Sequence, residues 1–255
     1  MKKFLLGTIA AVTLAFSAGS AKAVIWGVQD DLDEYPYVGA VFTDEGNPLG
    51  QTVCSGVLLD DDALLTAAHC VDEAVALPIV TFGSNAVAFT ALALALPVIH
   101  PDYNAIQDGP DVAILKLFFL FGSAPATAAQ LPLAGYLDGA ATERGTLHDR
   151  IYTTVGYGIS GDFPNVSAEF FRQIGDLSLI SVNSAAGELY AQFSSNTGVV
   201  SGGACLGDSG GPVFAPDGVS VVGVNSFGVT ENCVGTGFAS RIDIQEVLDF
   251  INNTK

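Results

Sequence analysis

Basic residues are scarce in this chain of 255 residues, which has nine Lys and Arg against 27 Asp and Glu. The formal net charge of −18 disfavours binding to nucleic acid and to anionic membrane surfaces, so neither partner is expected. A solvated acidic surface without a specific partner is the simpler interpretation of this charge. Charged residues make up only 14% of the chain and hydrophobic residues 49%, so the protein can bury a sizeable core.

Long apolar runs are missing after the first 23 residues: the run Leu115–Phe121 is short and contains Lys116. A membrane-spanning helix needs about 20 apolar residues. The start of the chain combines two lysines, an apolar run over Phe4–Phe16 and a small-x-small sequence ending at Ala23, which is typical of a secretory signal peptide. An uncleaved anchor is the alternative, but this run is too short for it. We therefore expect residues 1–23 to be removed and the protein to be secreted or periplasmic, away from the membrane.

Only four cysteines are present, and none has the Cys-x-x-Cys spacing of common zinc sites. No metal and no other cofactor is expected. An even number of cysteines in an exported chain suggests two disulfides, for which the residues alone allow three connectivities. The four residues are Cys54, Cys70, Cys205 and Cys233.

Short apolar runs alternate with turn sequences, and Gly is frequent with 29 residues, which favours an all-β chain of many short strands. A linker rich in Ala, Gly and Pro at about 122–149 separates two sets of runs. The first set comprises a turn into a strand at Tyr35–Val41 and the runs Val53–Leu59, Ala63–Ala67, Pro78–Phe82, Val87–Ile99 and Val112–Leu120. The second set comprises Ile151–Val155, Ile174–Val182, Leu189–Phe193, Pro212–Phe214, Val219–Asn225 and Thr236–Ile242.

Two segments have a spacing of apolar residues that fits a helix. The residues Ala91–Leu96 fit a helix or a strand by period alone, and a strand is favoured because strands surround them and Pro97 would end the segment. Apolar residues at helical spacing over about 243–253 predict a C-terminal amphipathic helix with Asp243 near its N-cap. The expected order is one set of strands over about 24–121, the linker, a second set over about 150–242, and the helix.

Histidine is rare, with three residues, and this narrows the choice of a catalytic base. His148 lies in the linker beside charged residues and suits a solvated surface role, while His100 begins a turn and suits a structural role. His69 is the remaining candidate. A buried core histidine is the alternative for His69, but two further clusters, Asp111–Leu117 and Gly207–Pro212, argue against it.

Together these residues supply the parts of a serine hydrolase. A serine hydroxyl is a weak nucleophile near neutral pH and needs a base, which in turn needs an orienting carboxylate. Ser209 is the candidate nucleophile, His69 the base and Asp111 the orienting group. Glycines around Ser209 permit a tight turn in which the N–H groups of Gly207 and Ser209 converge on an oxyanion. An α/β-hydrolase esterase also has a Gly-x-Ser-x-Gly sequence, but such enzymes place the histidine last and alternate strands with helices.

The three clusters resemble those of the chymotrypsin- and trypsin-like serine proteases, and His100–Asn104, Gly156–Gly158 and Asn225–Gly228 match as well. The likeness covers about 24–252 and implies an all-β fold of two antiparallel six-stranded β-barrels with a C-terminal helix. The triad would lie in the cleft between the barrels. The resemblance implies a serine endopeptidase acting on protein or peptide substrates, expected as a monomer. A catalytically inactive binding protein of this fold is the alternative, although this chain keeps all three triad residues.

The same resemblance implies a disulfide pairing. Cys54 would pair with Cys70 and clamp the loop that carries the candidate base. Cys205 would pair with Cys233 and brace the wall of the specificity pocket. The first of these loops spans about 16 residues, for which the chain-entropy model gives a stabilisation of roughly 3 kcal/mol.

An activation step is also implied by the resemblance. In this family a new N-terminal ammonium pairs with the aspartate just before the nucleophile, which here is Asp208. Cleavage after residue 23 exposes Val24 directly, so signal removal alone is expected to activate the protein. Trp26 stands where the family usually has Gly, and either Val24 or Ile25 is therefore the expected first residue.

The primary specificity pocket follows from the resemblance too. In relatives that cut after Lys or Arg, an acid lies six residues before the nucleophile, and here that position is Gly203. The other expected pocket residues are Ala204, Ser226, Phe227, Gly228 and Gly237. An open, uncharged pocket binds apolar side chains, so we expect cleavage after Phe, Tyr, Leu or Met. Loops that fill part of the pocket would instead select smaller residues.

Overall fold

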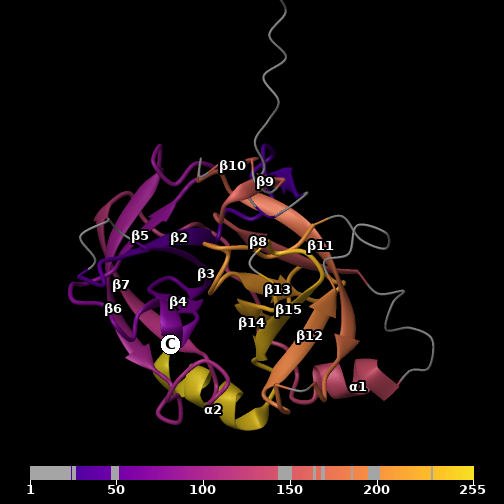
Figure 1. The fold of residues 1–255 in the computed structure, drawn as a ribbon. Helices are drawn as coiled ribbons and strands as arrows, with labels where there is room; N and C mark the ends of the chain where they lie inside the picture. The colour runs from indigo at the N-terminus through magenta and orange to yellow at the C-terminus, as the bar shows by residue number, and fades with distance from the viewer. Residues whose placement is uncertain are drawn as a thin grey trace, which may run out of the picture.

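The structure of the protein is a computed structural model, and Figure 1 shows it as a ribbon. The structure describes residues 24, 27–46, 52–142, 151–162, 165–167, 170–184, 186–194, 202–230 and 232–255. The predicted signal peptide over residues 1–23, Ile25, Trp26 and His148 lie outside the described residues. Within these ranges, no helix has the length and apolar character needed to cross a bilayer.

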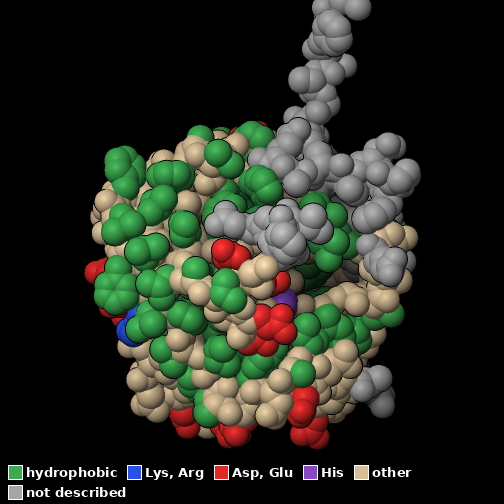
Figure 2. Space-filling view, turned by 60° about the vertical axis from the view of Figure 1, so that its left-hand side comes forward, with side chains coloured by type: hydrophobic (Ala, Val, Ile, Leu, Met, Phe, Trp, Pro, Cys, Tyr) green, Lys and Arg blue, Asp and Glu red, His purple; other side chains and the backbone are tan. Residues whose placement is uncertain are grey.

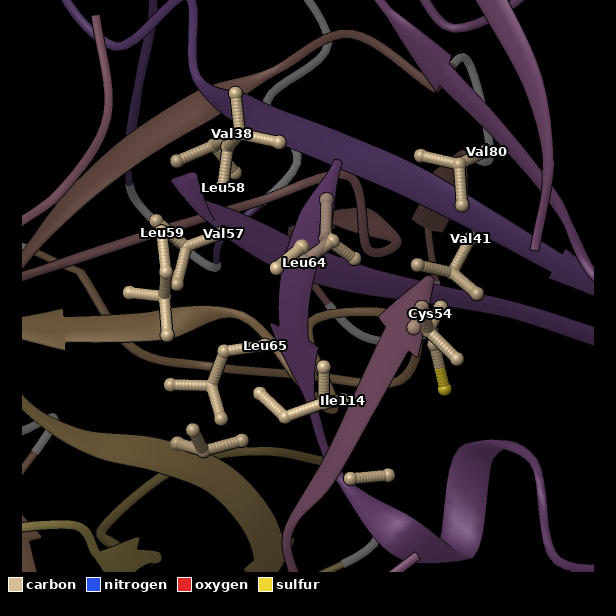
Figure 3. Close-up of a cluster of buried hydrophobic side chains, with 14 of the residues drawn as sticks. Val38, Val41, Cys54, Val57, Leu58, Leu59, Leu64, Leu65, Val80 and Ile114 are labelled. Atoms are coloured by element: carbon tan, nitrogen blue, oxygen red, sulfur yellow. The ribbon is translucent and has the colours of Figure 1, made fainter. Parts of the chain in front are cut away.

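The first half of the chain forms a closed antiparallel barrel with the strand order β2-β3-β4-β7-β6-β5. Its strands are β2 (Val38–Thr43), β3 (Thr52–Asp60), β4 (Ala63–Thr66), β5 (Ile79–Phe82), β6 (Ala91–Ile99) and β7 (Ala113–Phe121). Branched apolar side chains from neighbouring strands fill its interior, as Figure 3 shows for Val41, Leu64 and Ile114. These strands match the predicted runs because each run is bounded by turn residues.

Strand β6 places its small residues inside and its large ones outside. Ala91, Ala93 and Ala95 are buried, while Leu96 is 50% exposed. On the neighbouring strand β7, Phe118 is 59% exposed. Figure 2 shows hydrophobic side chains gathered over the surface of this barrel. The crowded interior explains the small inward residues, because side chains of opposite strands meet at the centre of a narrow barrel.

The expectation that Pro97 ends the segment at Leu96 is wrong, because β6 continues to Ile99. Pro97 lacks an N–H group and is tolerated only where one edge of a strand is unpaired. β6 pairs with β5 only from Ala91 to Leu94, whereas it pairs with β7 as far as Ile99. Pro97 therefore lies beyond the end of β5, where no ladder partner is lost.

The second half forms a sheet with the order β1-β11-β12-β15-β14-β13-β8, which closes into a six-stranded barrel because β11 also pairs with β8. Its strands are β8 (Ile151–Gly156), β11 (Gln173–Ser181), β12 (Tyr190–Ser194), β13 (Pro212–Phe214), β14 (Val221–Gly228) and β15 (Thr236–Arg241). The short β1 (Val28–Gln29) adds the N-terminal segment to β11, and β9 (Ser160–Asp162) and β10 (Asn165–Ser167) form a hairpin. The predicted all-β fold of two six-stranded barrels is confirmed.

Helix α2 (Gln245–Thr254) ends the chain and buries Val247, Leu248 and Ile251, which confirms the predicted C-terminal helix. Asp243 lies directly before the N-cap residue Ile244, near the N-cap as predicted, but no side chain caps the helix. The Asp243 carboxylate instead forms a buried ion pair with Arg241 and accepts a hydrogen bond from the N–H of Leu137.

That hydrogen bond belongs to helix α1 (Tyr136–Thr142), which lies in the segment expected to be a linker. The side chain of Leu137 is fully buried in the core of the second barrel. The short helix is thus held by tertiary contacts rather than by a helical sequence pattern, and for this reason it was not predicted.

Candidate active site

The pairing of β4 with β7 brings two predicted site residues together. Thr66, at the end of β4, lies opposite Ala113, at the start of β7. His69 follows β4 in the short 3₁₀ helix η1 (Ala68–Cys70), and Asp111 precedes β7 by two residues. Because the strands are antiparallel, both residues emerge at the same end of the first barrel.

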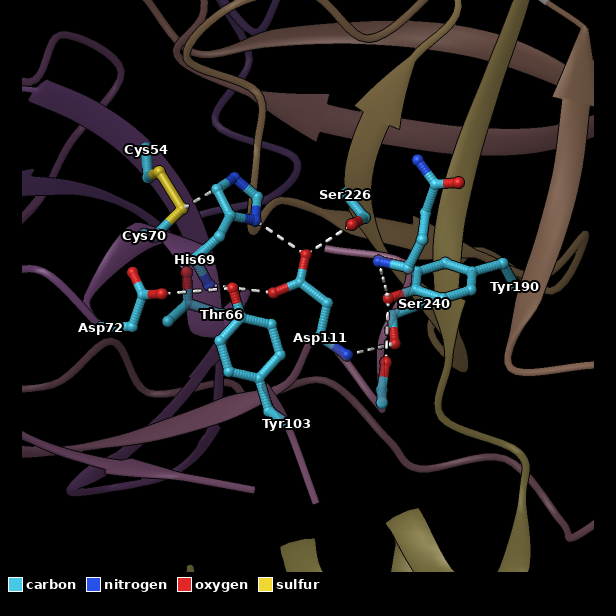
Figure 4. A network of polar contacts seen from close by, with 12 residues as sticks. Cys54, Thr66, His69, Cys70, Asp72, Tyr103, Asp111, Tyr190, Ser226 and Ser240 are labelled. Carbon is cyan, nitrogen blue, oxygen red and sulfur yellow. Dashed lines mark hydrogen bonds and ion pairs between the residues drawn. A yellow bond between two sulfur atoms is a disulfide. The ribbon is translucent and has the colours of Figure 1, made fainter. Parts of the chain in front are cut away.

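Asp111 holds the ring and backbone of His69 in one orientation (Figure 4). The Nδ1 atom of His69 lies 2.7 Å from Oδ2 of Asp111, and the N–H group of His69 donates to Oδ1 at 2.9 Å. The Asp111 side chain is fully buried, whereas that of His69 is 19% exposed. With Nδ1 bound to the carboxylate, Nε2 is the ring nitrogen left to accept a proton.

Two serines complete the surroundings of Asp111 (Figure 4). Ser226 donates its hydroxyl to Oδ2, and Ser240 accepts a hydrogen bond from the backbone N–H of Asp111 at 3.1 Å. Burial opposes ionisation of Asp111, but the hydrogen bonds and charge of His69, with the hydrogen bond of Ser226, lower the pKa of its carboxyl below the usual value. Ser226 was expected only in the substrate pocket, and the local sequence carries no signal for its contact with Asp111.

Ser209 lies on a loop that is fixed against the first barrel. The N–H of Ser55 in β3 donates to the carbonyl of Ser209 at 2.7 Å. The next residue, Gly210, has a φ of 79° and approaches Thr66 so closely that a Cβ there would collide with the Thr66 hydroxyl. A glycine at this position therefore allows the loop to sit directly beside the end of β4, where His69 follows.

Two cavities meet at this point, and His69 and Ser209 line both of them. Nε2 of the His69 ring lies 3.8 Å from Sγ of Cys70. Within the described part of the chain, no hydrogen bond joins this ring to the Ser209 hydroxyl. Hydrogen bonds of catalytic groups often tighten only when substrate is bound.

The loop before Ser209 exposes backbone donors. Gly207 has a φ of 96°, and its carbonyl accepts a hydrogen bond from the Ser55 hydroxyl at 2.9 Å. Among the hydrogen bonds of the described residues, none uses the N–H of Gly207 or of Ser209. Both N–H groups are therefore available to a bound oxyanion.

Asp208 is fully buried beneath this loop. Its carboxylate accepts hydrogen bonds from the N–H groups of Cys205 and Gly158, each at 2.9 Å. Burial raises the pKa of Asp208 to about 7 despite these two hydrogen bonds. Among the described residues, no cation pairs with this carboxylate.

The predicted partner of Asp208, Val24, is also buried. A Cβ at Gly156 of β8 would collide with the Asp208 carboxylate, and a Cβ at Gly175 of β11 would collide with Val24. Gly156 pairs with Gln173, two residues before Gly175, so both glycines face the same side of the β8–β11 ladder. Val24 and Asp208 thus pack on one sheet face at positions about 7 Å apart along the strand.

The larger cavity has a volume of about 670 Å³ and opens beside Ser209. Five predicted pocket residues line it, namely Ala204, Ser226, Phe227, Gly228 and Gly237. Leu177, Phe193 and Phe238 add apolar surface that the sequence analysis did not predict. Among the described residues, none of the lining side chains is an Asp, Glu, Lys or Arg.

Gly203, predicted to form the base of the pocket, does not line this cavity. It is buried, and its backbone and that of Gly202 pack against Gly175 of β11. This close approach of two backbones draws the segment into the barrel wall. The apolar side chains of Leu177 and Phe193 supply the lining in its place.

The cysteines form the two disulfides that the resemblance implied, Cys54–Cys70 and Cys205–Cys233. The sulfur atoms of Cys54 and Cys70 lie close to His69, but a disulfide offers no thiolate to a metal. His100 is buried against Phe250, with ring centroids 4.7 Å apart, and burial lowers its pKa. His100 is thus a packing residue, as predicted.

The chain is similar to known proteins over most of its length. The family model described as Trypsin matches residues 24–251. The chain is 27% identical over 226 residues to a trypsin of Saccharopolyspora erythraea, covering 84% of this chain and 89% of that protein. It is 25% identical over 218 residues to brachyurin of Leptuca pugilator, covering 82% and 88%. The solved structure of HL collagenase superposes with a TM-score of 0.69 at 22% identity, covering 86% of this chain and 93% of that one.

Proposed function

Because the chain belongs to the trypsin family and is a serine endopeptidase, we propose that it cleaves peptide bonds with Ser209, His69 and Asp111 as its catalytic triad. The observation that carries this proposal is the 2.7 Å contact between Nδ1 of His69 and the buried Asp111 carboxylate, beside a serine that lines the same cavities. This geometry leaves Nε2 of His69 to take the proton from Ser209.

In the proposed reaction, the Ser209 oxygen attacks the carbonyl carbon of the substrate while its proton passes to His69. The imidazolium that forms is stabilised by the ionised Asp111. His69 then gives the proton to the leaving amine, and the acyl group remains on Ser209. A water molecule, activated in turn by His69, attacks the acyl-enzyme and regenerates the free serine.

The negative charge that develops on the carbonyl oxygen would be held by the N–H groups of Gly207 and Ser209. Loss of one such donor typically costs about 3–4 kcal/mol of transition-state stabilisation. The absence of any other described partner for these two donors supports the assignment. The Ser55 hydroxyl holds the carbonyl of Gly207, and this carbonyl belongs to the peptide that lies between the two donors in the chain.

We infer that the residue before the scissile bond is apolar. The uncharged 670 Å³ cavity beside Ser209 supports this inference, since it offers Leu177, Phe193 and Phe238 to a bound side chain. Burial of an apolar side chain stabilises the complex by about 1.5–3 kcal/mol. The expected substrates are proteins or peptides with Phe, Tyr, Leu or Met at this position.

The proposed activation is cleavage after residue 23, followed by pairing of the new ammonium with Asp208. The burial of Val24 on the same sheet face as Asp208 supports it. The two disulfides agree with an oxidising compartment, so we expect a secreted or periplasmic protein. N-terminal sequencing of the active form checks this step: a start at Val24 or Ile25 is expected, and a start well beyond Ile25 contradicts it.

A fluorophosphonate probe tests the assignment of the nucleophile. Such probes react with serines that a neighbouring base has activated. We expect mass spectrometry of the labelled protein to find the adduct on Ser209, and labelling to be lost in the His69→Ala variant. Labelling that persists in that variant, or that falls on another serine, contradicts the proposal.

A further inference from the structure

Arg172 is a fully buried cation outside the active site. Its Nε atom lies 2.8 Å from Oδ2 of Asp30, whose side chain is also fully buried. Its Nη2 atom contacts Asp33, which is 59% exposed. Its Nη1 atom donates to the carbonyl of Val38 and to the hydroxyl of Tyr157, both at 3.3 Å. The guanidinium therefore joins the beginning of the chain to residues far along the sequence.

Asp30 fixes the segment that directly follows the predicted new N-terminus. The N–H of Asp30 donates to the carbonyl of Arg172 at 2.9 Å. Its carboxylate also accepts from the N–H groups of Glu34 at 2.7 Å and Tyr35 at 3.1 Å. Residues 27–35, here termed the N-terminal segment, are therefore closed into a turn around Asp30 and tied to the start of β11.

Tyr157 links the guanidinium of Arg172 to the residues around Asp208. It lies between Gly156 and Gly158, which we term the receiving loop. The N–H of Gly158 donates to Asp208, and the N–H of Tyr157 donates at 2.9 Å to the Ser55 hydroxyl, which in turn holds the carbonyl of Gly207. The Tyr157 hydroxyl is fixed in turn by the carbonyls of Val38 and Gly83. The same guanidinium thus contacts both the N-terminal segment and the receiving loop.

We propose that Arg172, together with Asp30, is a positioning residue that aligns the released N-terminus with Asp208. The inference rests on the activation step proposed above and names residues that guide it. A buried ion pair adds little net stability, because desolvation offsets most of the attraction. Its directional hydrogen bonds nevertheless fix the relative position of the groups that they join. Here these groups are the N-terminal segment and the receiving loop.

The experiment uses the mature enzyme and the double variant Asp30→Asn with Arg172→Met, which removes both charges and leaves neither unpaired. Docking of the ammonium raises its pKa above the ordinary value of about 8, so activity is lost when alkaline pH deprotonates it. If the ammonium docks tenfold more weakly, activity is lost at a pH about one unit lower. For the double variant we therefore expect kcat/KM to fall at a pH about one unit lower than in the wild type. We also expect a succinimidyl ester to acylate its α-amine about tenfold faster.

The matched control is a second buried pair, Arg241 with Asp243, whose cation also contacts a mostly exposed aspartate, Asp138. The variant Arg241→Met with Asp243→Asn removes an equivalent pair that touches neither the N-terminal segment nor the receiving loop. We expect this control variant to lose about as much thermal stability as the Arg172 variant. Its kcat/KM is expected to fall at the same alkaline pH as in the wild type, and its α-amine to react as slowly as in the wild type. If the Arg172 pair does not fold, Tyr157→Phe supplies the comparison, because it removes the contact between the guanidinium and the receiving loop and leaves the ion pair in place.

The outcomes separate the two proposals. Suppose that the α-amine is protected from acylation in the wild type, and that the Arg172 variant shows the same protection and the same pH dependence of kcat/KM. This result overturns the role of Arg172 but leaves the activation step standing. An α-amine that reacts freely in the wild type, together with an active Asp208→Asn variant, overturns the activation step and the role of Arg172 with it.

Discussion

Ser226 donates its hydroxyl to the same oxygen of Asp111 that contacts Nδ1 of His69. The carboxylate therefore receives its two side-chain donors from opposite barrels, since His69 follows β4 and Ser226 belongs to β14. This contact fixes Asp111 in the cleft and helps to keep it ionised. Ser226 thus lines the substrate cavity and also supports Asp111 of the proposed triad.

The variant Ser226→Ala tests this support. A hydrogen bond to a charged group is worth about 1.5–3 kcal/mol, so we expect kcat to fall by about tenfold or more, with a smaller change in KM. Steady-state kinetics on a peptide p-nitroanilide measure both constants. Ser240→Ala is the comparison, because Ser240 contacts the backbone of Asp111 rather than its carboxylate, and its effect is expected to be smaller. A Ser226→Ala enzyme with the kcat of the wild type contradicts this role.

The pKa of Asp208, raised to about 7, makes the unprocessed chain sensitive to pH. Between about pH 4 and pH 7 the folded chain holds a proton on Asp208 that the unfolded chain has lost. The free energy of unfolding therefore falls as pH rises through this window, by on the order of 4 kcal/mol in total. Urea unfolding of a Ser209→Ala chain with an extra residue before Val24 measures it.

Asp208→Asn in the same background is the control for that measurement. It removes the titrating group, so the difference in pH dependence between the two proteins isolates Asp208 from the other carboxylates. In the proposed activation, a released N-terminus pairs with the ionised carboxylate, and the mature protein is therefore expected to lose this destabilisation. An identical pH dependence with and without Asp208 contradicts the buried, unpaired carboxylate described above.

Gly228 and Gly237 pair across β14 and β15 at the cavity wall. A Cβ at either position meets its nearest atom at 3.9 Å, so a side chain fits there and projects into the cavity. We expect Gly237→Val to lower kcat/KM for a Phe substrate by about 10-fold to 100-fold, which corresponds to the burial energy of such a side chain. Cleavage after Ala is expected to persist.

A panel of p-nitroanilides with Phe, Leu, Ala, Arg and Lys measures this specificity. Gly139→Ala is a neutral control, since a Cβ on this residue of α1 meets nothing within 4 Å. Preference of the wild type for Arg or Lys contradicts an apolar pocket. Equal loss on the Phe and Ala substrates in Gly237→Val points to misfolding of the wall and likewise opposes the assignment.

The barrels could be predicted from the sequence because each strand is a short apolar run closed by turn residues. The candidate triad could be predicted because its three residues lie in local clusters. The missed features depend on contacts between distant segments. Helix α1 is held by Asp243 of the C-terminal region, and Arg172 meets Asp30 across 142 positions of sequence. The packing of Gly202 and Gly203 against Gly175 could not be predicted either, because a sequence offset does not reveal which way a backbone turns.

The most direct test of the proposed triad is the activity of the mature enzyme against its Ser209→Ala and His69→Ala variants, on one peptide substrate with an apolar residue before the scissile bond. Groups that act as a unit show non-additive losses. We predict that each single variant lowers kcat/KM by about 10⁴-fold or more and that the double variant is no worse than either. A Ser209→Ala enzyme that retains activity within tenfold of the wild type would contradict the account.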